Sequence, residues 1–165
     1  MSATASVPQI AAELTRLESE PRQAIAALRK LDIFRGKVTV ITGSPGAGKS
    51  SLLQRLLSAF TGRGERVGAI LIDPSSPVTG GALLGDRLRM IDCGVEDNVF
   101  VRSVAAKSGA ESVGMVAPVM AWTLLNFGFD HVFVESVGIG QQELDVSRRC
   151  QRLNLVPRAS SRALG

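Results

Sequence analysis

Residues 43–50 constrain the fold of this chain more than any other segment. They are Gly43, Ser44, Pro45, Gly46, Ala47, Gly48, Lys49 and Ser50, which fits the phosphate-binding pattern of two glycines, a lysine and a hydroxyl. An apolar stretch at 38–41 precedes them, and leucines at helical spacing follow them. This context of a strand giving way to a helix argues against an ordinary glycine-rich turn. The segment therefore predicts a loop that holds a nucleoside triphosphate.

The chemistry of such a loop assigns a role to each residue type. Glycines allow successive backbone N–H groups to point at phosphate oxygens, and the helix N-terminus adds a partial positive charge. Lys49 is expected to reach the β- and γ-phosphates, and the Ser50 hydroxyl is expected to bind Mg²⁺. Ser51, the next residue, completes the predicted nucleotide-binding set.

Composition is that of an ordinary globular domain. The chain has 165 residues, 45% of them hydrophobic and 21% charged, which suits one domain with a substantial core. No apolar run is long enough to span a membrane, and the first nine residues lack the basic and apolar regions of a leader peptide. We therefore expect a cytoplasmic protein that makes no membrane contact.

Charge and cysteine content exclude further classes. The net charge of +4 does not indicate a nucleic-acid partner, because the arginines near the end of the chain have no aromatic residues between them for base stacking. Cys93 and Cys150 lie far apart with no second cysteine or histidine close by in sequence, so they form neither a zinc motif nor a disulfide framework.

The order of the predicted elements indicates an α/β fold. Strands are predicted at 38–41, 67–72, 99–104 and 131–134, with helices at 52–60 and 112–127, the second broken or kinked near Pro118. We predict a P-loop NTPase fold with a mostly parallel sheet. Because the carboxyl ends of parallel strands share one edge, Asp73 and Glu135 should converge on the phosphates, as a site for metal and water.

Two further segments complete this outline. Residues 10–31 predict a helical N-terminal arm, with a second helix starting at Pro21, and the arm serves either as part of the core or as a docking element. Residues 74–81 form a long turn-rich connection of the kind that is usually functional.

Three ordered blocks resemble one known family. They are residues 43–50, the segment 72–90 with IDPSSP and LGDRLRM, and VESVGIGQ at 134–141. Together they are similar to the P-loop GTPase metallochaperones of methylmalonyl-CoA mutase, a family also described as LAO/AO transport system kinases. The resemblance runs from about residue 31 to residue 145.

The resemblance implies a metal site and two switches. Asp73 and Asp86 hold Mg²⁺ directly or through water, and the segment between them is the first switch. Glu135 holds metal-bound or attacking water, while the N–H of Gly138 contacts the γ-phosphate in the second switch. Gln141 is a further candidate for positioning water.

The implied metal ligands are thus Ser50, Asp73, Asp86 and Glu135, and the implied catalytic residues are Lys49, Asp86 and Glu135. Asp73 has an alternative as a turn former and Asp86 as a helix cap. A purely structural Glu135 is disfavoured, because a carboxylate after an apolar strand is costly unless it is exposed or coordinated.

The end of the chain departs from the family pattern. The family continues with a strand, a helix and an Asn-Lys-x-Asp motif that pairs with guanine, whereas residues 147–165 read as an atypical basic tail. Either a truncated or frame-shifted end, or a short paralogue with a natural basic tail, explains this. The predicted organisation is an arm at 1–31, a partial GTPase domain at 32–146 and the tail at 147–165. We expect this loss to leave the sheet incomplete at its C-terminal end and the phosphate-loop strand with an unpaired edge.

Three functions remain open from the sequence. The first, implied by the resemblance, is a Mg²⁺-dependent GTPase that acts as a chaperone for an adenosylcobalamin-dependent acyl-CoA mutase, as a homodimer. The second is a kinase associated with lysine, arginine and ornithine transport, which requires an acceptor pocket that the sequence does not show. The third is an inactive remnant.

Overall fold

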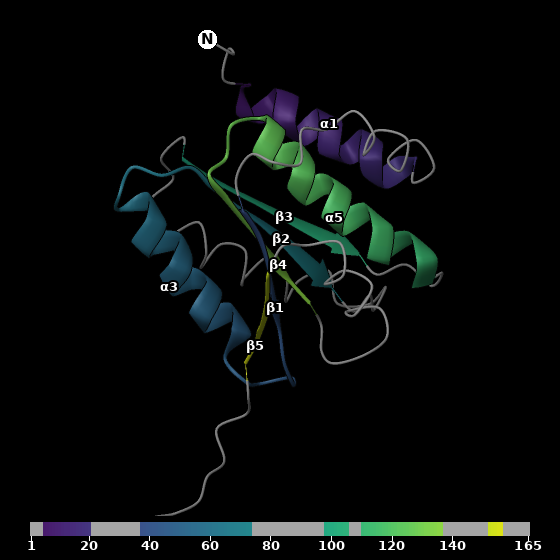
Figure 1. Ribbon diagram of the computed structural model, residues 1–165. Coiled ribbons are helices and arrows are strands. Elements are labelled where there is room, and N and C mark those ends of the chain that lie inside the picture. Colours follow the sequence, from purple (N-terminus) through teal and green to yellow (C-terminus); the bar gives the residue numbers. More distant parts are fainter. Residues whose placement is uncertain (1–4, 21–36, 74–97, 106–109, 137–151, 157–165) are drawn as a thin grey trace, which may run out of the picture.

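The computed structural model describes residues 5–20, 37–73, 98–105, 110–136 and 152–156. The elements, in chain order, are α1 (Val7–Ser19), β1 (Lys37–Thr42), α3 (Lys49–Thr61), β2 (Val67–Asp73), β3 (Val99–Ala105), α5 (Ala110–Asn126), β4 (His131–Glu135) and β5 (Arg152–Leu155). The strands form one sheet in the order β3-β2-β4-β1-β5, and every pair is parallel (Figure 1). This is the predicted α/β architecture.

The central strands are buried on both faces. In β1 every residue after Lys37 is buried. In β4 the three middle residues, Val132, Phe133 and Val134, are buried. Continuous apolar runs of this kind are typical of parallel strands that are covered on both faces by helices. The register sets Val40 opposite Val134, so the two strands end at the same edge of the sheet, which we call the carboxyl edge.

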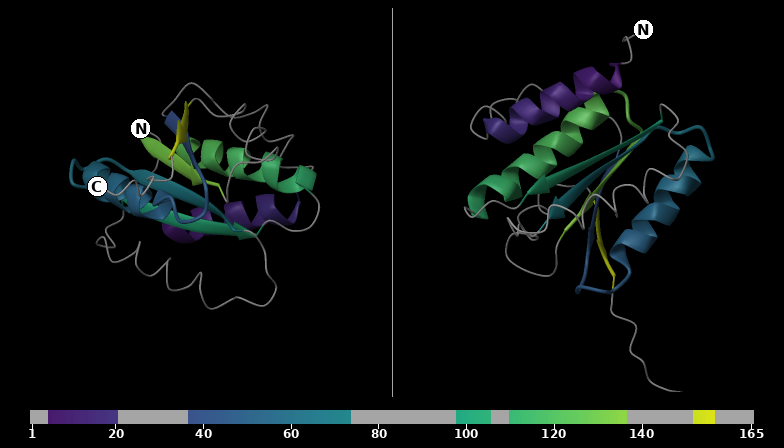
Figure 2. Two further views of the ribbon diagram at one scale, coloured as in Figure 1. Left: turned by 90° about the horizontal axis from the view of Figure 1, so that it is seen from below. Right: turned by 180° about the vertical axis from the view of Figure 1, so that it is seen from behind.

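Helices α1 and α5 cover one face of the sheet and α3 covers the other (Figure 2). The apolar side of α1, Ile10, Leu14 and Leu17, is fully buried in the same core cluster as α5. The sequence left open whether the N-terminal arm is part of the core or a docking element, and α1, the described part of the arm, is part of the core. A second helix from Pro21 lies outside the described residues.

Helix α5 lies very close to the sheet. A Cβ atom at Gly68 in β2 would lie 2.8 Å from Leu124 Cδ1, so any larger residue there requires the Leu124 side chain to shift. The helix is continuous from Ala110 to Asn126 and includes Pro118, so the predicted break does not occur. Among the described helices, none combines the length and apolarity needed to cross a membrane.

The prediction that the phosphate-loop strand, β1, has an unpaired edge is wrong. Strand β5 pairs with β1 in parallel, from Thr39 opposite Arg152 to Thr42 opposite Leu155, and the Val156 N–H then donates to the Thr42 carbonyl over 2.7 Å. Residues 152–155 do alternate polar and apolar side chains, but the run is short and its surroundings are basic. Residues 152–155 form a strand because the backbone groups of β1 offer them hydrogen-bond partners, although their own sequence gives only a weak strand signal.

Candidate functional site

The phosphate loop joins β1 to α3 at the carboxyl edge, as the sequence predicts. Gly46 and Gly48 have φ angles of 74° and 88°, a left-handed conformation that glycine adopts without strain. Between them, the Ala47 N–H donates to the Ser44 carbonyl over 3.1 Å and closes a turn. Helix α3 then starts at Lys49, so its N-terminal N–H groups are presented beside the loop.

Lys49 is the most constrained side chain of the loop. It is only 8% exposed, and its Nζ donates to the carbonyl oxygens of Gly43 over 2.9 Å and Ser44 over 3.2 Å. An ammonium group has three donors, so the two loop carbonyls orient it without using all of its capacity to donate to phosphate oxygens. The loop thus places a fixed positive charge at its own mouth.

Ser50 and Glu135 meet across the carboxyl edge. The Ser50 hydroxyl donates to Glu135 Oε1 over 2.7 Å, although the two residues belong to α3 and β4. The end of β4 is held in place because the Ser136 N–H donates to the Ile41 carbonyl over 3.0 Å. A serine hydroxyl that donates its single proton to a carboxylate keeps its lone pairs for a cation.

This pair fits the chemistry of Mg²⁺. The ion prefers hard oxygen ligands and is commonly held by one or two protein groups together with substrate phosphates. Ser50 Oγ and the half-buried Glu135 carboxylate are such groups. Ser50 directly follows Lys49 in the sequence. Within the described residues, no three His, Cys, Asp or Glu side chains form a group that could hold a metal ion.

The other predicted site residues fall into two groups. Pro45, Gly46 and Ser51 are exposed at the loop, and Ser44 and Ala47 are half-buried there. Asp73 is the last residue of β2 and pairs with Ala105. Leu71, two residues earlier in β2, pairs with Glu135, so the backbone of Asp73 lies at the carboxyl edge. Its side chain is not among the described features. Asp86, Gly138 and Gln141 lie outside the described residues.

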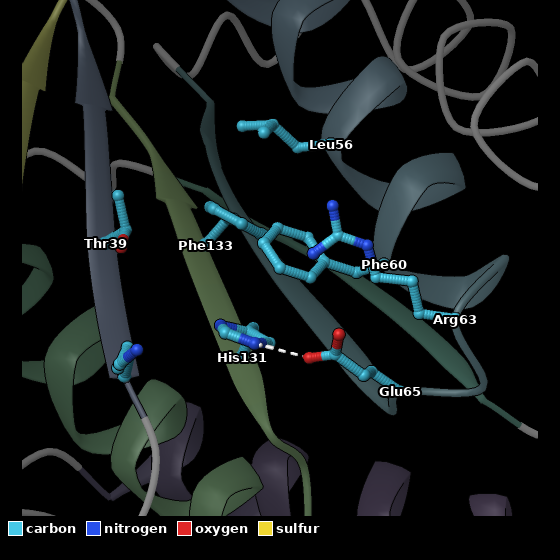
Figure 3. Close-up of a pocket in the computed structure, with 8 residues that line it drawn as sticks. Thr39, Leu56, Phe60, Arg63, Glu65, His131 and Phe133 are labelled. Carbon is cyan, nitrogen blue, oxygen red and sulfur yellow. Dashed lines mark hydrogen bonds and ion pairs between the residues drawn. The ribbon is translucent and has the colours of Figure 1, made fainter.

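A cavity of about 420 Å³ lies away from the phosphate loop, between α3 and the strands β1 and β4 (Figure 3). It is lined by Lys37, Thr39, Leu56, Phe60, Arg63, Glu65, His131 and Phe133. Lys37 and His131 start their strands, so the cavity extends toward the end of the sheet opposite the loop. It does not form part of the phosphate site.

His131 has a structural environment in this cavity. Its Nε2 lies 2.7 Å from Glu65 Oε2, and its ring is 4.1 Å from that of Phe60 between centroids. Trp122, the tryptophan of the chain, is buried in the core at 6% exposure. Neither side chain lies at the loop. Sequence reasoning missed Val156, whose carbonyl borders Gly43, because nothing in its local sequence indicates a strand beside the loop.

Comparisons with known proteins identify relatives of this chain. A putative GTPase of Pyrococcus abyssi is 39% identical over 145 residues, which are 87% of this chain and 45% of that protein. The GTPase ArgK of Escherichia coli is 40% identical over 108 residues, 66% of this chain and 33% of that protein. The chain thus spans about half the length, or less, of the curated relatives it matches.

A more distant relative and a solved structure extend the comparison. The mitochondrial methylmalonic aciduria type A homolog of Caenorhabditis elegans is 36% identical over 119 residues, 70% of this chain and 29% of that protein. The crystal structure of LAO/AO transport system kinase superposes with a TM-score of 0.57 at 22% identity, over 93% of this chain and 51% of that chain. That structure supports the fold.

The family model described as methylmalonyl Co-A mutase-associated GTPase MeaB matches residues 10–160. This range includes the phosphate loop, the Ser50–Glu135 pair and β5. Because the match covers most of the chain, the chain belongs to the MeaB family of methylmalonyl-CoA mutase-associated GTPases.

Proposed function

We propose that this chain binds GTP together with Mg²⁺ and hydrolyses the γ-phosphate bond, and that this cycle serves a mutase partner. The observation that carries the proposal is the 2.7 Å hydrogen bond from Ser50 to Glu135 beside the tethered Lys49. A structural role alone does not explain why a hydroxyl, a carboxylate and a buried ammonium gather at one loop. A triphosphate with its metal uses all three.

The residues have separable tasks in this proposal. Backbone N–H groups of the loop and the Lys49 ammonium hold the phosphates in position, while Ser50 and Glu135 hold Mg²⁺, directly or through water. When bound, Mg²⁺ neutralises charge that develops on the phosphate oxygens. Glu135 also orients the Ser50 hydroxyl and is the candidate to position the attacking water. Positioning and charge neutralisation account for most of catalysis in this reaction class.

Three further assignments rest on the resemblance. Asp73 and Asp86 are proposed as additional Mg²⁺ ligands, direct or water-mediated, and the Gly138 N–H as a donor to the γ-phosphate. The position of Asp73 at the end of β2 supports its part in this set. Asp86 and Gly138 depend on sequence motifs alone, so their substitution is a separate test from that of Ser50 and Glu135.

The proposed partner is an adenosylcobalamin-dependent acyl-CoA mutase of the methylmalonyl-CoA type. Support comes from the family description, which names mutase association, and from the methylmalonic aciduria homolog. We further propose a homodimer located in the cytoplasm. Co-elution with the purified mutase, and protection of its activity in the presence of GTP, test the partner. Absence of both effects under conditions that support GTP binding contradicts it.

The chemical proposal is tested by phosphate release from GTP and ATP with Mg²⁺. We expect GTP hydrolysis to fall about 10²-fold or more in Glu135→Gln, because acid–base and water-positioning groups typically contribute 10²–10⁴-fold. Arg55→Ala, an exposed change on the same helix, is the matched control and should retain the wild-type rate. Equal rates in Glu135→Gln and wild type would remove Glu135 from the mechanism.

The same experiment separates the alternatives. A kinase transfers labelled γ-phosphate to an acceptor, whereas a GTPase releases it as free phosphate. An inactive remnant shows neither product and no nucleotide affinity. The proposed GTPase releases phosphate slowly on its own, because partner-supplied groups can add 10³–10⁵-fold in related switch proteins.

A further inference from the structure

We infer that β5 and Val156 position Lys49 for the triphosphate by supporting the backbone of Gly43. This inference rests on the proposed nucleotide-binding function. It assigns a role in the nucleotide site to a segment that is far from the loop in sequence and that local sequence patterns do not identify as a strand.

The first contact joins Val156 to the end of β1. The β5 register runs to Leu155 opposite Thr42, and the Val156 N–H donates to the Thr42 carbonyl over 2.7 Å. Thr42 is the last residue of β1, directly before the phosphate loop. The last hydrogen bond of the β1–β5 pair therefore fixes the position from which the loop departs.

The second contact involves the first residue of the loop. A Cβ atom at Gly43 would lie 2.3 Å from the Val156 carbonyl oxygen and 3.4 Å from Val156 Cβ. The backbone of Val156 thus occupies the space that a side chain at Gly43 would need, so the two backbones pack directly against each other. On its other side, the Gly43 carbonyl accepts the 2.9 Å hydrogen bond from Lys49 Nζ.

Val156 is itself anchored. Its half-buried side chain packs against the core cluster on the α3 face, which includes Ile41, Leu53 and Leu57. The same cluster carries the helix that begins at Lys49. A continuous set of contacts therefore runs from Val156 through Gly43 to the ammonium group. A shift of β5 displaces the carbonyl that orients Lys49, and small misplacements of phosphate-binding groups are costly.

The test uses two substitutions at one position. Val156→Pro removes the N–H that donates to Thr42, whereas Val156→Ala keeps that N–H and shortens only the side chain that packs on the core, so the two variants separate the backbone contribution from the side-chain contribution. We expect Val156→Pro to weaken binding of a fluorescent Mg²⁺–GTP analogue by about 10-fold, and Val156→Ala by no more than about 2-fold. Wild-type affinity in a folded Val156→Pro protein would overturn the inference.

A double-mutant cycle separates positioning from general destabilisation. If Val156 acts through Lys49, Val156→Pro should cause little further loss in a Lys49→Ala background. The same fold-loss in both backgrounds would overturn the inference. Nucleotide concentrations must extend high enough to measure the weakened complexes.

Hydrogen exchange of the unmodified protein provides a second measurement in case Val156→Pro does not fold. Coupling between sites is reciprocal, so Mg²⁺–GTP should slow exchange of the Val156 amide, whereas amides of β3, at the other edge of the described sheet, should change less. Equal slowing at both edges overturns the inference. Failure of the wild-type chain to bind Mg²⁺–GTP instead contradicts the proposed function itself.

Discussion

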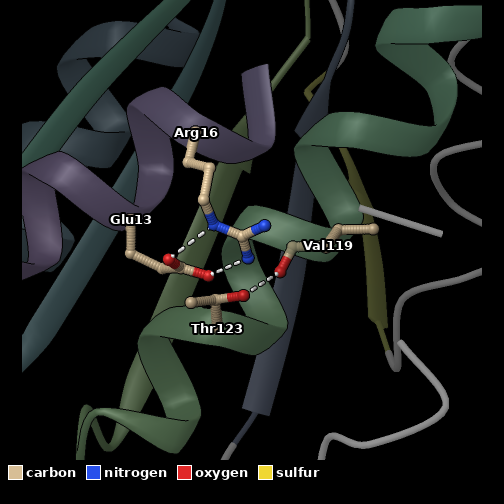
Figure 4. A network of polar contacts seen from close by, with 4 residues as sticks. All are labelled: Glu13, Arg16, Val119 and Thr123. Atoms are coloured by element: carbon tan, nitrogen blue, oxygen red, sulfur yellow. Dashed lines mark hydrogen bonds and ion pairs between the residues drawn. The ribbon is translucent and has the colours of Figure 1, made fainter. Parts of the chain in front are cut away.

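On one face of the sheet α1 and α5 form an apolar layer, whereas on the other face α3 carries the phosphate loop at its N-terminus (Figure 2). The α1–α5 face buries Ile10, Leu14, Met120 and Leu124 completely. A buried polar group of this face bonds within the layer: the Thr123 hydroxyl donates a hydrogen bond to the Val119 carbonyl over 2.9 Å (Figure 4).

Polar groups on the α3 side have a different arrangement. Lys49 is oriented by carbonyl groups of the phosphate loop, and Ser50 is oriented by Glu135 of β4, so the partners of both side chains lie at the carboxyl edge. The comparison teaches that both faces bury apolar side chains, whereas the groups proposed to bind nucleotide lie on the α3 side alone. Substitutions on the two faces should therefore separate the free energy of unfolding from nucleotide affinity.

The largest expected effect is on nucleotide affinity. Lys49→Ala should weaken Mg²⁺–GTP binding by about 10²–10⁴-fold, because hydrogen bonds to charged groups contribute about 1.5–3 kcal/mol each and two phosphates are contacted. Equilibrium fluorescence titration measures this, with Arg55→Ala as the exposed control on α3. Similar affinity in Lys49→Ala and Arg55→Ala would contradict the assignment of the loop.

The next effect is on stability. Leu14→Ala removes a fully buried side chain from the α1–α5 face and should lower the free energy of unfolding by about 2–5 kcal/mol. Urea denaturation measures the loss, and the exposed Thr15→Ala on the same helix should change it by about 0.5 kcal/mol or less. Folded Leu14→Ala should bind Mg²⁺–GTP normally; a large loss of affinity would break the separation of the two faces.

A smaller effect is expected where α1 is tied to β3. Arg102 Nη2 lies 2.8 Å from Glu18 Oε2, and the side chains are 19% and 24% exposed. Arg102→Met should lower the free energy of unfolding by about 1 kcal/mol, because the ion pair is only partly buried. A double-mutant cycle with Glu18→Gln isolates the pair. Zero coupling energy would show that α1 is held by apolar contacts alone.

The smallest effect concerns an exposed pair on α1. Arg16 Nη2 and Nε donate to Glu13 over 2.6 and 2.9 Å, and this hydrogen bonding lowers the pKa of Glu13 (Figure 4). A folded-state pKa below the unfolded value stabilises the protein above the unfolded pKa, and this stability is lost as pH falls through the folded pKa.

Glu13→Gln should therefore lower Tm by about 1 °C at neutral pH, since exposed pairs contribute little. At a pH below the folded-state pKa of Glu13 the substitution should have no effect, which makes low pH its own control. Thermal unfolding followed by circular dichroism at both pH values measures the difference. An equal shift at both would assign the effect to something other than the ion pair.

The sequence predicted much of this arrangement because the main signals are local. Apolar runs identify β1, β2, β3 and β4, the glycines and Lys49 identify the loop, and parallel pairing brings Glu135 to Ser50. Strand β5 was missed because its pairing depends on β1 rather than on its own residues. The tether from Lys49 to Gly43 and Ser44 is likewise a feature of loop geometry that residue type alone does not specify.

The most direct test of the central claim is an NMR titration of the wild-type chain with Mg²⁺ and a slowly hydrolysed GTP analogue. We predict saturable amide shift changes concentrated at Gly46, Gly48, Lys49 and Ser50, with much smaller changes at Phe60 and His131 around the separate cavity. Shifts concentrated at Phe60 and His131, or no saturable shifts, would contradict the assignment of the phosphate loop as the binding site.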